Sequence, residues 1–179
     1  MQRIPRLQTD SVPEASRPLI ENIKAQFGRV PAIFATLAHS PAALKALTAI
    51  AEALDAGKLA GKPHEAIALR ISELNGCAYC KAAHTGIAAM AGATTAETLE
   101  WRKGEASNPK TKALLDLAAS IAEKRGAVED SELAAARAAG LNDEEILEAV
   151  AVVVCTVFTN SINNLAQTEV DFPAAPALE

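Results

Sequence analysis

The stretch that decides the interpretation of this sequence is Glu65-Ala-Ile-Ala-Leu-Arg-Ile-Ser-Glu-Leu-Asn-Gly-Cys77-Ala-Tyr-Cys80-Lys-Ala-Ala-His84. Lys62-Pro63, just before it, is a typical helix start, and Asn75-Gly76 within it is a typical helix stop. A second helix begins at Cys77 and ends at Gly92. The stretch therefore predicts a helical hairpin from Pro63 to Gly92, which we expect at the centre of the fold.

The other helix boundaries carry similar signals. Two more helices begin with an N-cap residue followed by proline, at Ser40-Pro41 and Asn108-Pro109. Two others begin with a capping-box pattern, in which the N-cap residue is followed three positions later by glutamate. We expect helices at about residues 13–27, 31–38, 41–55, 63–74, 77–92, 94–101, 109–124, 130–140 and 142–165.

Length and composition favour an all-α protein with a single domain. The chain has 179 residues, which is enough for one domain with a sizeable core. Half of the residues are apolar but only 3% are aromatic, so the core consists mainly of small and aliphatic side chains, which suits closely packed helices. We expect one domain over 1–179, with an N-terminal helical segment (1–60), a core redox domain (61–168) and an irregular tail (169–179).

The charge of the chain excludes two classes of partner. A net charge of −5 and a pI near 5.3 leave no basic surface for nucleic acid or anionic membranes. The first residues, 1–6, lack the apolar stretch of a signal peptide, and the longest apolar run, about 149–158, is too short to span a bilayer. We therefore expect a cytoplasmic protein that binds neither nucleic acid nor a membrane.

The apolar run itself is ambiguous in secondary structure. Residues 150–155 have strand propensity, but the upstream cap and the lack of other strands favour a helix. A helix that is apolar all round belongs at the centre of the fold or in a subunit interface. Cys155, within this run, is expected to be a small core residue.

The cysteine pair and the histidine are predicted to share one helix face. At 100° per residue, Cys77, Cys80 and His84 lie within about 60° of one another. Cys77 lies near the helix N-terminus, where unpaired N–H groups and the helix dipole favour a thiolate. His84 is one turn beyond Cys80 and two turns beyond Cys77, so it is better placed to exchange a proton with Cys80.

Glu65 is predicted to lie beside this histidine. If the hairpin turns at Asn75-Gly76, Glu65 comes level with about Gly86, within a turn of His84. A carboxylate beside an imidazole orients the ring and raises its basicity. Glu65 and His84 can then relay a proton to or from Cys80, and Cys77 is positioned to close a disulfide after Cys80 is oxidised.

The quoted stretch resembles the signature of the alkyl hydroperoxidase D-like proteins of the carboxymuconolactone decarboxylase superfamily. That signature has a glutamate twelve residues before a C-x-x-C and a histidine four residues after its second cysteine, and Glu65, Cys77, Cys80 and His84 fill these positions. The resemblance implies a helical bundle that forms homo-oligomers, either trimers or hexamers. It also implies a thiol peroxidase or disulfide reductase that needs no haem, metal or other cofactor.

Carried over from the resemblance, Cys80 attacks the peroxide, Cys77 resolves it, His84 is the base and Glu65 its partner. The expected substrate is a small hydroperoxide, and the expected electron donor is a thiol or a lipoyl-type dithiol. This chain departs from the pattern at Tyr79, where well-characterised members have histidine. A second departure is in the last helix, whose asparagines are not followed by the arginine often found in relatives.

Three other interpretations of these residues stay open. Cys77, Cys80, His84 and Glu65 are a chemically acceptable zinc ligand set, although they crowd onto two helical turns. The cysteines can instead act as a redox sensor in a binding protein. A non-redox lyase of the decarboxylase type is the third, and it would use His84 and Glu65 without the cysteines. Of the other histidines, His39 and His64 are expected at the surface or at helix caps.

Overall fold

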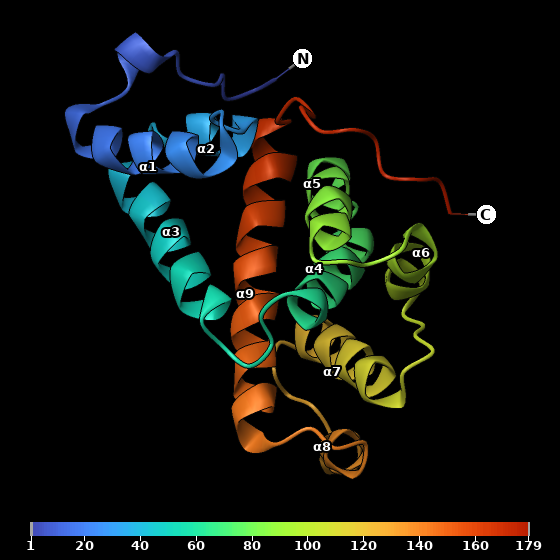
Figure 1. The fold of residues 1–179 in the computed structure, drawn as a ribbon. Coiled ribbons are helices and arrows are strands. Elements are labelled where there is room, and N and C mark those ends of the chain that lie inside the picture. The colour runs from blue at the N-terminus through green and yellow to red at the C-terminus, as the bar shows by residue number, and fades with distance from the viewer. Residues whose placement is uncertain (1, 179) are drawn as a thin grey trace.

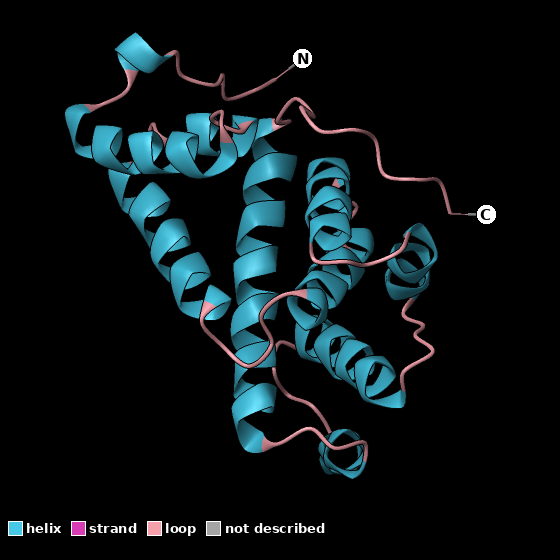
Figure 2. Ribbon diagram, in the orientation of Figure 1, coloured by secondary structure: helices cyan, strands magenta, loops and turns pink. Residues whose placement is uncertain are grey.

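The computed structural model of the protein describes residues 2–178, and over these residues it contains helices and loops but no strands (Figures 1 and 2). The expected all-α fold is confirmed. Two short 3₁₀ turns, Thr9–Ser11 and Glu14–Ser16, precede the α-helices. These are α1 (Arg17–Phe27), α2 (Ala32–Leu37), α3 (Pro41–Asp55), α4 (Lys62–Leu74), α5 (Ala78–Met90), α6 (Thr95–Lys103), α7 (Pro109–Lys124), α8 (Asp130–Ala138) and α9 (Asp143–Ala166).

The predicted hairpin is formed by α4 and α5, with Asn75-Gly76 as the turn. Gly76 has φ +62°, a left-handed conformation that is open to glycine without steric cost. Helix α4 packs against α5, α6, α7 and α9, and its residues 66–69 are fully buried. The hairpin therefore lies inside the bundle, as its apolar sequence predicts.

Helix α9 extends beyond the apolar run 149–158 at both ends. It begins with a polar first turn, which the capping box of Asn142 and Glu145 stabilises. By length and composition it is able to cross a membrane, a property that core helices of soluble proteins share. The apolar run 149–158 alone is shorter than a bilayer span, as predicted, but the helix that contains it is not. In the structure α9 packs against α2, α3, α4, α5 and α7, and Figure 1 shows it between α3 and the hairpin.

Small differences from the predicted boundaries occur at helix ends. The first helix begins at Arg17 instead of Pro13, because the residues between them form a 3₁₀ turn and Pro18 occupies the first turn of the α-helix. Helix α6 continues past Trp101 to Lys103 and ends at Gly104, which has φ +83°.

The tail after α9 has no regular structure, as expected, but it is attached to the body at two places. Asp171 pairs with Arg29 and accepts a hydrogen bond from the backbone N–H of Ala32 at 3.0 Å. Further on, Arg102 of α6 donates to the carbonyl of Pro176. The tail therefore runs from the end of α9 past α5 toward α6 (Figure 1).

One face of α9 is apolar and exposed. Leu147, Val154 and Leu165 are 70%, 55% and 64% exposed, and Val150 and Val157 are partly exposed between them. At 100° per residue these side chains lie within about 80° of one another. A continuous apolar stripe of this kind is typical of a helix that packs against another surface.

We predict that the chain self-associates through this face of α9. Val154→Lys places a charge in the middle of the stripe, and we expect it to lower the molar mass measured by light scattering at micromolar concentration. Val170→Lys, which changes a partly exposed valine of the tail, is the control and should leave the mass unchanged. A wild-type protein that is monomeric under these conditions would contradict the prediction.

Candidate functional site

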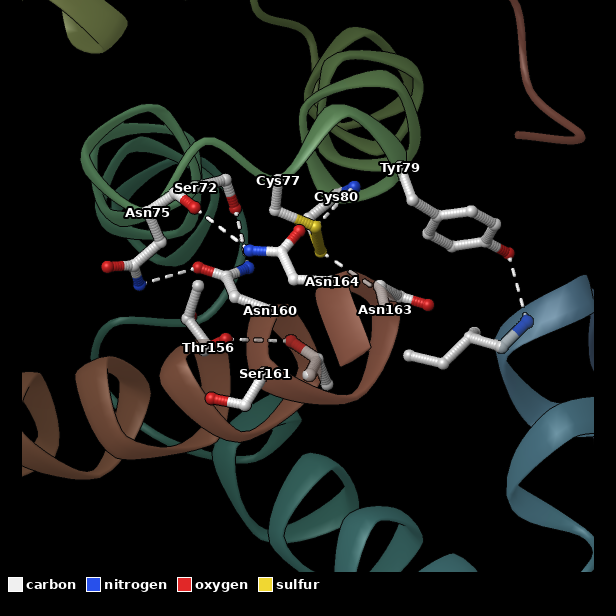
Figure 3. The surroundings of a disulfide bond; sticks show 12 residues. Ser72, Asn75, Cys77, Tyr79, Cys80, Thr156, Asn160, Ser161, Asn163 and Asn164 are labelled. Carbon is white, nitrogen blue, oxygen red and sulfur yellow. Dashed lines mark hydrogen bonds between the residues drawn. A yellow bond between two sulfur atoms is a disulfide. The ribbon is translucent and has the colours of Figure 1, made fainter. Parts of the chain in front are cut away.

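The cysteine pair lies where the hairpin turn meets α5. Cys77 is the N-cap of α5, and its Sγ accepts a hydrogen bond from the backbone N–H of Cys80 at 3.2 Å. The two Cα atoms are 5.3 Å apart and the sulfur atoms are joined in a disulfide (Figure 3). Both residues are buried, so any reactant has to reach them through an internal pocket.

Glu65 and His84 meet across the hairpin, as the position of the turn predicts. Oε2 of Glu65 lies 2.8 Å from Nδ1 of His84. The carboxylate accepts from the Nδ1–H group, so in the neutral ring Nε2 is the nitrogen that can accept a proton. Glu65 is buried at the start of α4 and His84 is partly buried.

A cavity of about 620 Å³ brings these groups together. Cys80, His84 and Glu65 line it, whereas Cys77 is absent from its wall. The wall is completed by α1, α2, α3, α9 and the tail, and it is mainly apolar. Its large apolar side chains are Phe27, Ile33, Phe34, Leu47, Ile87, Met90 and Phe172. The N-terminal segment and the tail are therefore parts of this site.

Tyr79, between the two cysteines, is directed toward α2 and away from the disulfide (Figure 3). Its hydroxyl accepts a hydrogen bond from the N–H of Ile33 at 3.3 Å, and its ring and that of Phe172 form a T-shaped pair with their centres 5.7 Å apart. Burial raises the pKa of Tyr79, and the nearby Asp171 adds to this effect, so the phenol stays neutral. Tyr79 thus holds α2 and the tail against the hairpin.

The asparagines of α9, for which the sequence predicted no role, contact the hairpin directly (Figure 3). Asn163 donates from Nδ2 to the Sγ of Cys80 at 3.3 Å. Asn160 donates to the hydroxyl of Ser72 at 3.1 Å and accepts from Asn75 at 2.8 Å. Asn164 donates to the backbone carbonyl of Asn75 at 2.9 Å. Two sequence signals pointed to them: their clustering in an apolar helix, and the place of asparagines in the last helix of the family that the sequence resembles.

The geometry of this site agrees with the alkyl hydroperoxidase D-like signature that the sequence resembles. A family model described as the carboxymuconolactone decarboxylase family matches residues 41–107 and, a second time, residues 97–168. Together the two matches run from the start of α3 to just past the end of α9. The chain belongs to the carboxymuconolactone decarboxylase family.

Within this family, the protein is similar to solved AhpD-like structures. An alkylhydroperoxidase AhpD core from Ralstonia eutropha JMP134, an uncharacterized peroxidase-related protein, has a TM-score of 0.85 and 25% identity over 95% of this chain and 92% of that one. A putative antioxidant defence protein AhpD from Agrobacterium tumefaciens, of unknown function, has a TM-score of 0.66 and 26% identity over 77% of this chain and 95% of that one. The predicted AhpD-like resemblance is confirmed.

A third solved structure shows that the same fold occurs with other chemistry. The debrominase Bmp8, solved in complex with 2,3,4-tribromopyrrole, has a TM-score of 0.77 and 19% identity over 94% of this chain and 91% of that one. At this identity the likeness concerns the fold alone. A comparison with curated proteins found no match.

Two residues for which the sequence predicted no place in the site line the pocket. His64 was expected at the surface or a cap, but it lies on the pocket wall with its ring centre 6.5 Å from that of His84. The expectation failed because the pocket that His64 lines is closed by helices distant in sequence, which no local pattern reveals. Cys155 is buried as expected but also lines the pocket, and burial raises its pKa to about 11, so its thiol stays protonated. By contrast His39 is exposed, as expected.

The zinc interpretation receives no support from the arrangement of side chains. Within residues 2–178, no group of three or more His, Cys, Asp or Glu side chains is placed to hold a metal ion. The disulfide also ties up both sulfur atoms that a zinc site would use.

We predict that His64 is neutral at pH 7. Burial lowers its pKa below the ordinary value of 6.5, the nearby His84 acts in the same direction, and the Glu65 and Asp55 carboxylates oppose them. The chemical shifts of its ring protons should therefore titrate with a midpoint below 6.5 in an NMR experiment, with His64→Gln used to assign the signal. A midpoint at or above 6.5 would show that the carboxylates outweigh burial.

Proposed function

We propose that the protein is a thiol-dependent peroxidase that reduces organic hydroperoxides at Cys80 and is recycled by a dithiol. One observation carries the proposal: Cys80, disulfide-bonded to Cys77, lines the same pocket as the paired Glu65 and His84. A reversible disulfide, a base held by a carboxylate, and an apolar pocket are what this reaction needs.

The first step uses Cys80 because Cys80 lines the pocket and Cys77 does not. His84 takes the thiol proton, and Glu65 stabilises the imidazolium that results. The Cys80 thiolate attacks the terminal oxygen of the hydroperoxide, forming an S–O bond while the O–O bond breaks. Cys80 becomes a sulfenic acid, and the alkoxide leaves with the proton from His84 as an alcohol.

The second step forms the disulfide seen in the structure. Cys77 attacks the sulfur of the Cys80 sulfenic acid, and the hydroxyl leaves with the Cys77 proton as water. A Cα separation of 5.3 Å lies within the range of ordinary disulfides, so the hairpin need not rearrange.

The third step restores the thiols with a dithiol donor of the lipoyl or protein type. One donor sulfur attacks the Sγ of Cys80, and Cys77 leaves as a thiolate. This leaving group lies at the N-cap of α5, where the N–H of Cys80 already donates to its sulfur. Stabilising the leaving thiolate speeds exchange. The second donor thiol then releases Cys80 and forms the donor disulfide, so that two electrons pass in each cycle.

The pocket supports organic hydroperoxides as substrates. Its walls are mainly aromatic and aliphatic, and its one arginine, Arg29, is paired with Asp171 and lies 4.7 Å from the centre of the Phe172 ring. No free cation therefore faces the cavity from its lining. An uncharged, apolar R group gains from burial in such a pocket, and hydrogen peroxide lacks this contribution.

The cysteine assignment predicts distinct outcomes for two serine variants. Cumene hydroperoxide added in one equivalent to the reduced protein should consume two thiols per chain. Cys77→Ser should stop at a sulfenic acid on Cys80, trapped with dimedone and located by mass spectrometry. Cys80→Ser should lose turnover with dithiothreitol.

Wild-type turnover in Cys80→Ser would end the assignment. Activity on a lactone acid that survives replacement of both cysteines would instead establish the non-redox lyase.

The proposed proton relay, in which Glu65 stabilises the His84 imidazolium, predicts that removing the Glu65 charge slows the reaction. Glu65→Gln keeps the ring in place but removes the charge that stabilises the imidazolium, so kcat/KM for cumene hydroperoxide at pH 7 should fall by about 10–100-fold. Glu52→Gln, the same change at an exposed position of α3, is the control and should match the wild type. Equal rates for both variants would show that Glu65 does not act through His84.

A further inference from the structure

Asn163 occupies a distinctive position in the pocket. It is 4% exposed, lines the cavity and donates from Nδ2 to the Sγ of Cys80 at 3.3 Å. Its carbonyl oxygen, Oδ1, is buried and has no hydrogen-bond partner within residues 2–178. Figure 3 shows this oxygen pointing away from the disulfide, toward the side on which Tyr79 lies. A buried amide oxygen without a partner is costly and calls for an explanation.

The other polar side chains of this part of α9 have partners. Asn160, three residues earlier, uses its nitrogen on Ser72 and its oxygen on Asn75. The hydroxyls of Thr156 and Thr159, which also line the pocket, donate to backbone carbonyls of α9. Within residues 2–178, Asn163 therefore differs from these neighbours in having a buried acceptor without a partner, next to the amide nitrogen that bonds the reactive sulfur.

We propose that Asn163 is a catalytic residue that binds both reactants of the first step, donating from Nδ2 to the Cys80 sulfur and accepting at Oδ1 from the O–H of the hydroperoxide. The proposal rests on the peroxidase function proposed above. The carbonyl and NH₂ of one planar amide then hold the terminal oxygen of the substrate next to the sulfur that attacks it.

This arrangement fits each stage of the reaction. The NH₂ group stabilises the Cys80 thiolate, because hydrogen bonds to the charged form lower a pKa. When the S–O bond forms and the O–O bond breaks, the hydroxyl bound to Asn163 stays on Cys80 as the sulfenic acid. The alkoxide leaves on the other side and takes its proton from His84. A dialkyl peroxide has no O–H to donate, so the site selects hydroperoxides.

The test uses the Cys77→Ser background, in which the pair contributes a single thiol. The pKa of Cys80 is measured from the pH dependence of its alkylation by iodoacetamide, and its reaction with cumene hydroperoxide by stopped flow. Asn163→Leu removes both polar groups and should raise the pKa of Cys80 by about one unit. The rate constant per thiolate for cumene hydroperoxide should fall at least tenfold.

Asn163→Asp keeps an acceptor oxygen but replaces the donor with a negative charge, so it should raise the pKa of Cys80 further than Asn163→Leu does. It is nearly isosteric with asparagine and decides the question if the leucine variant does not fold. Asn22→Asp makes the same change at an exposed position of α1 outside the pocket, and should leave both measurements at the parent values.

Thermal stability separates this role from a structural one. Because Oδ1 is unpaired, Asn163→Leu should melt at the same temperature as the parent or higher, while its reaction slows. A lower melting temperature with an unchanged rate constant per thiolate would overturn the proposal. So would parent values for the pKa and rate in both Asn163 variants.

The two proposals fail in distinguishable ways, because alkylation requires no peroxide. If the parent does not react with hydroperoxides while the Asn163 variants still raise the pKa of Cys80, the peroxidase function is wrong and the substrate contact falls with it. If the parent reacts and the variants match it, only the role of Asn163 is overturned.

Discussion

The sharp turn at Asn75-Gly76 is the constraint on which the site depends. It sets α4 and α5 side by side in one register, and that register brings Glu65 to His84. The same turn ends at Cys77, whose backbone N–H bonds back to the Ser72 carbonyl at 2.9 Å while its sulfur caps α5. A change in the length of this turn would separate the base from its carboxylate and shift both sulfur atoms together.

The rest of the bundle holds this turn from outside. Three asparagines of α9 reach across to it, of which Asn160 and Asn164 bond the turn region and Asn163 bonds the Cys80 sulfur. On the other side, α2 and the tail meet Tyr79. The hairpin carries the reactive groups, while elements distant in sequence close the space in front of them. The fold is shared with AhpD-like structures and with a debrominase, so the fold alone does not determine the chemistry.

Local signals in the sequence were sufficient for the helices and for half of the site. Cap residues, prolines and glycines indicate where the helices begin and end. Counting residues outward from the Asn75-Gly76 turn places Glu65 beside His84. The other half depends on contacts that no local pattern encodes. Arg29 and Asp171 are 142 residues apart, and the asparagine that reaches Cys80 is 83 residues from it. His64 was misassigned for the same reason, because the pocket that it lines is closed by helices distant in sequence.

The aromatic residues of this protein are few, and their placement makes it optically simple. The chain has one tyrosine and one tryptophan. Tyr79 lies between the two cysteines, and Trp101 is buried in a separate cluster with Ala66 and Leu69 of α4. The only phenol therefore reports on how α2 and the tail pack against the hairpin, while the only indole reports on the packing of α6 against α4. The near-ultraviolet spectrum can follow the closure of the pocket and the integrity of the core as separate signals, without any introduced label.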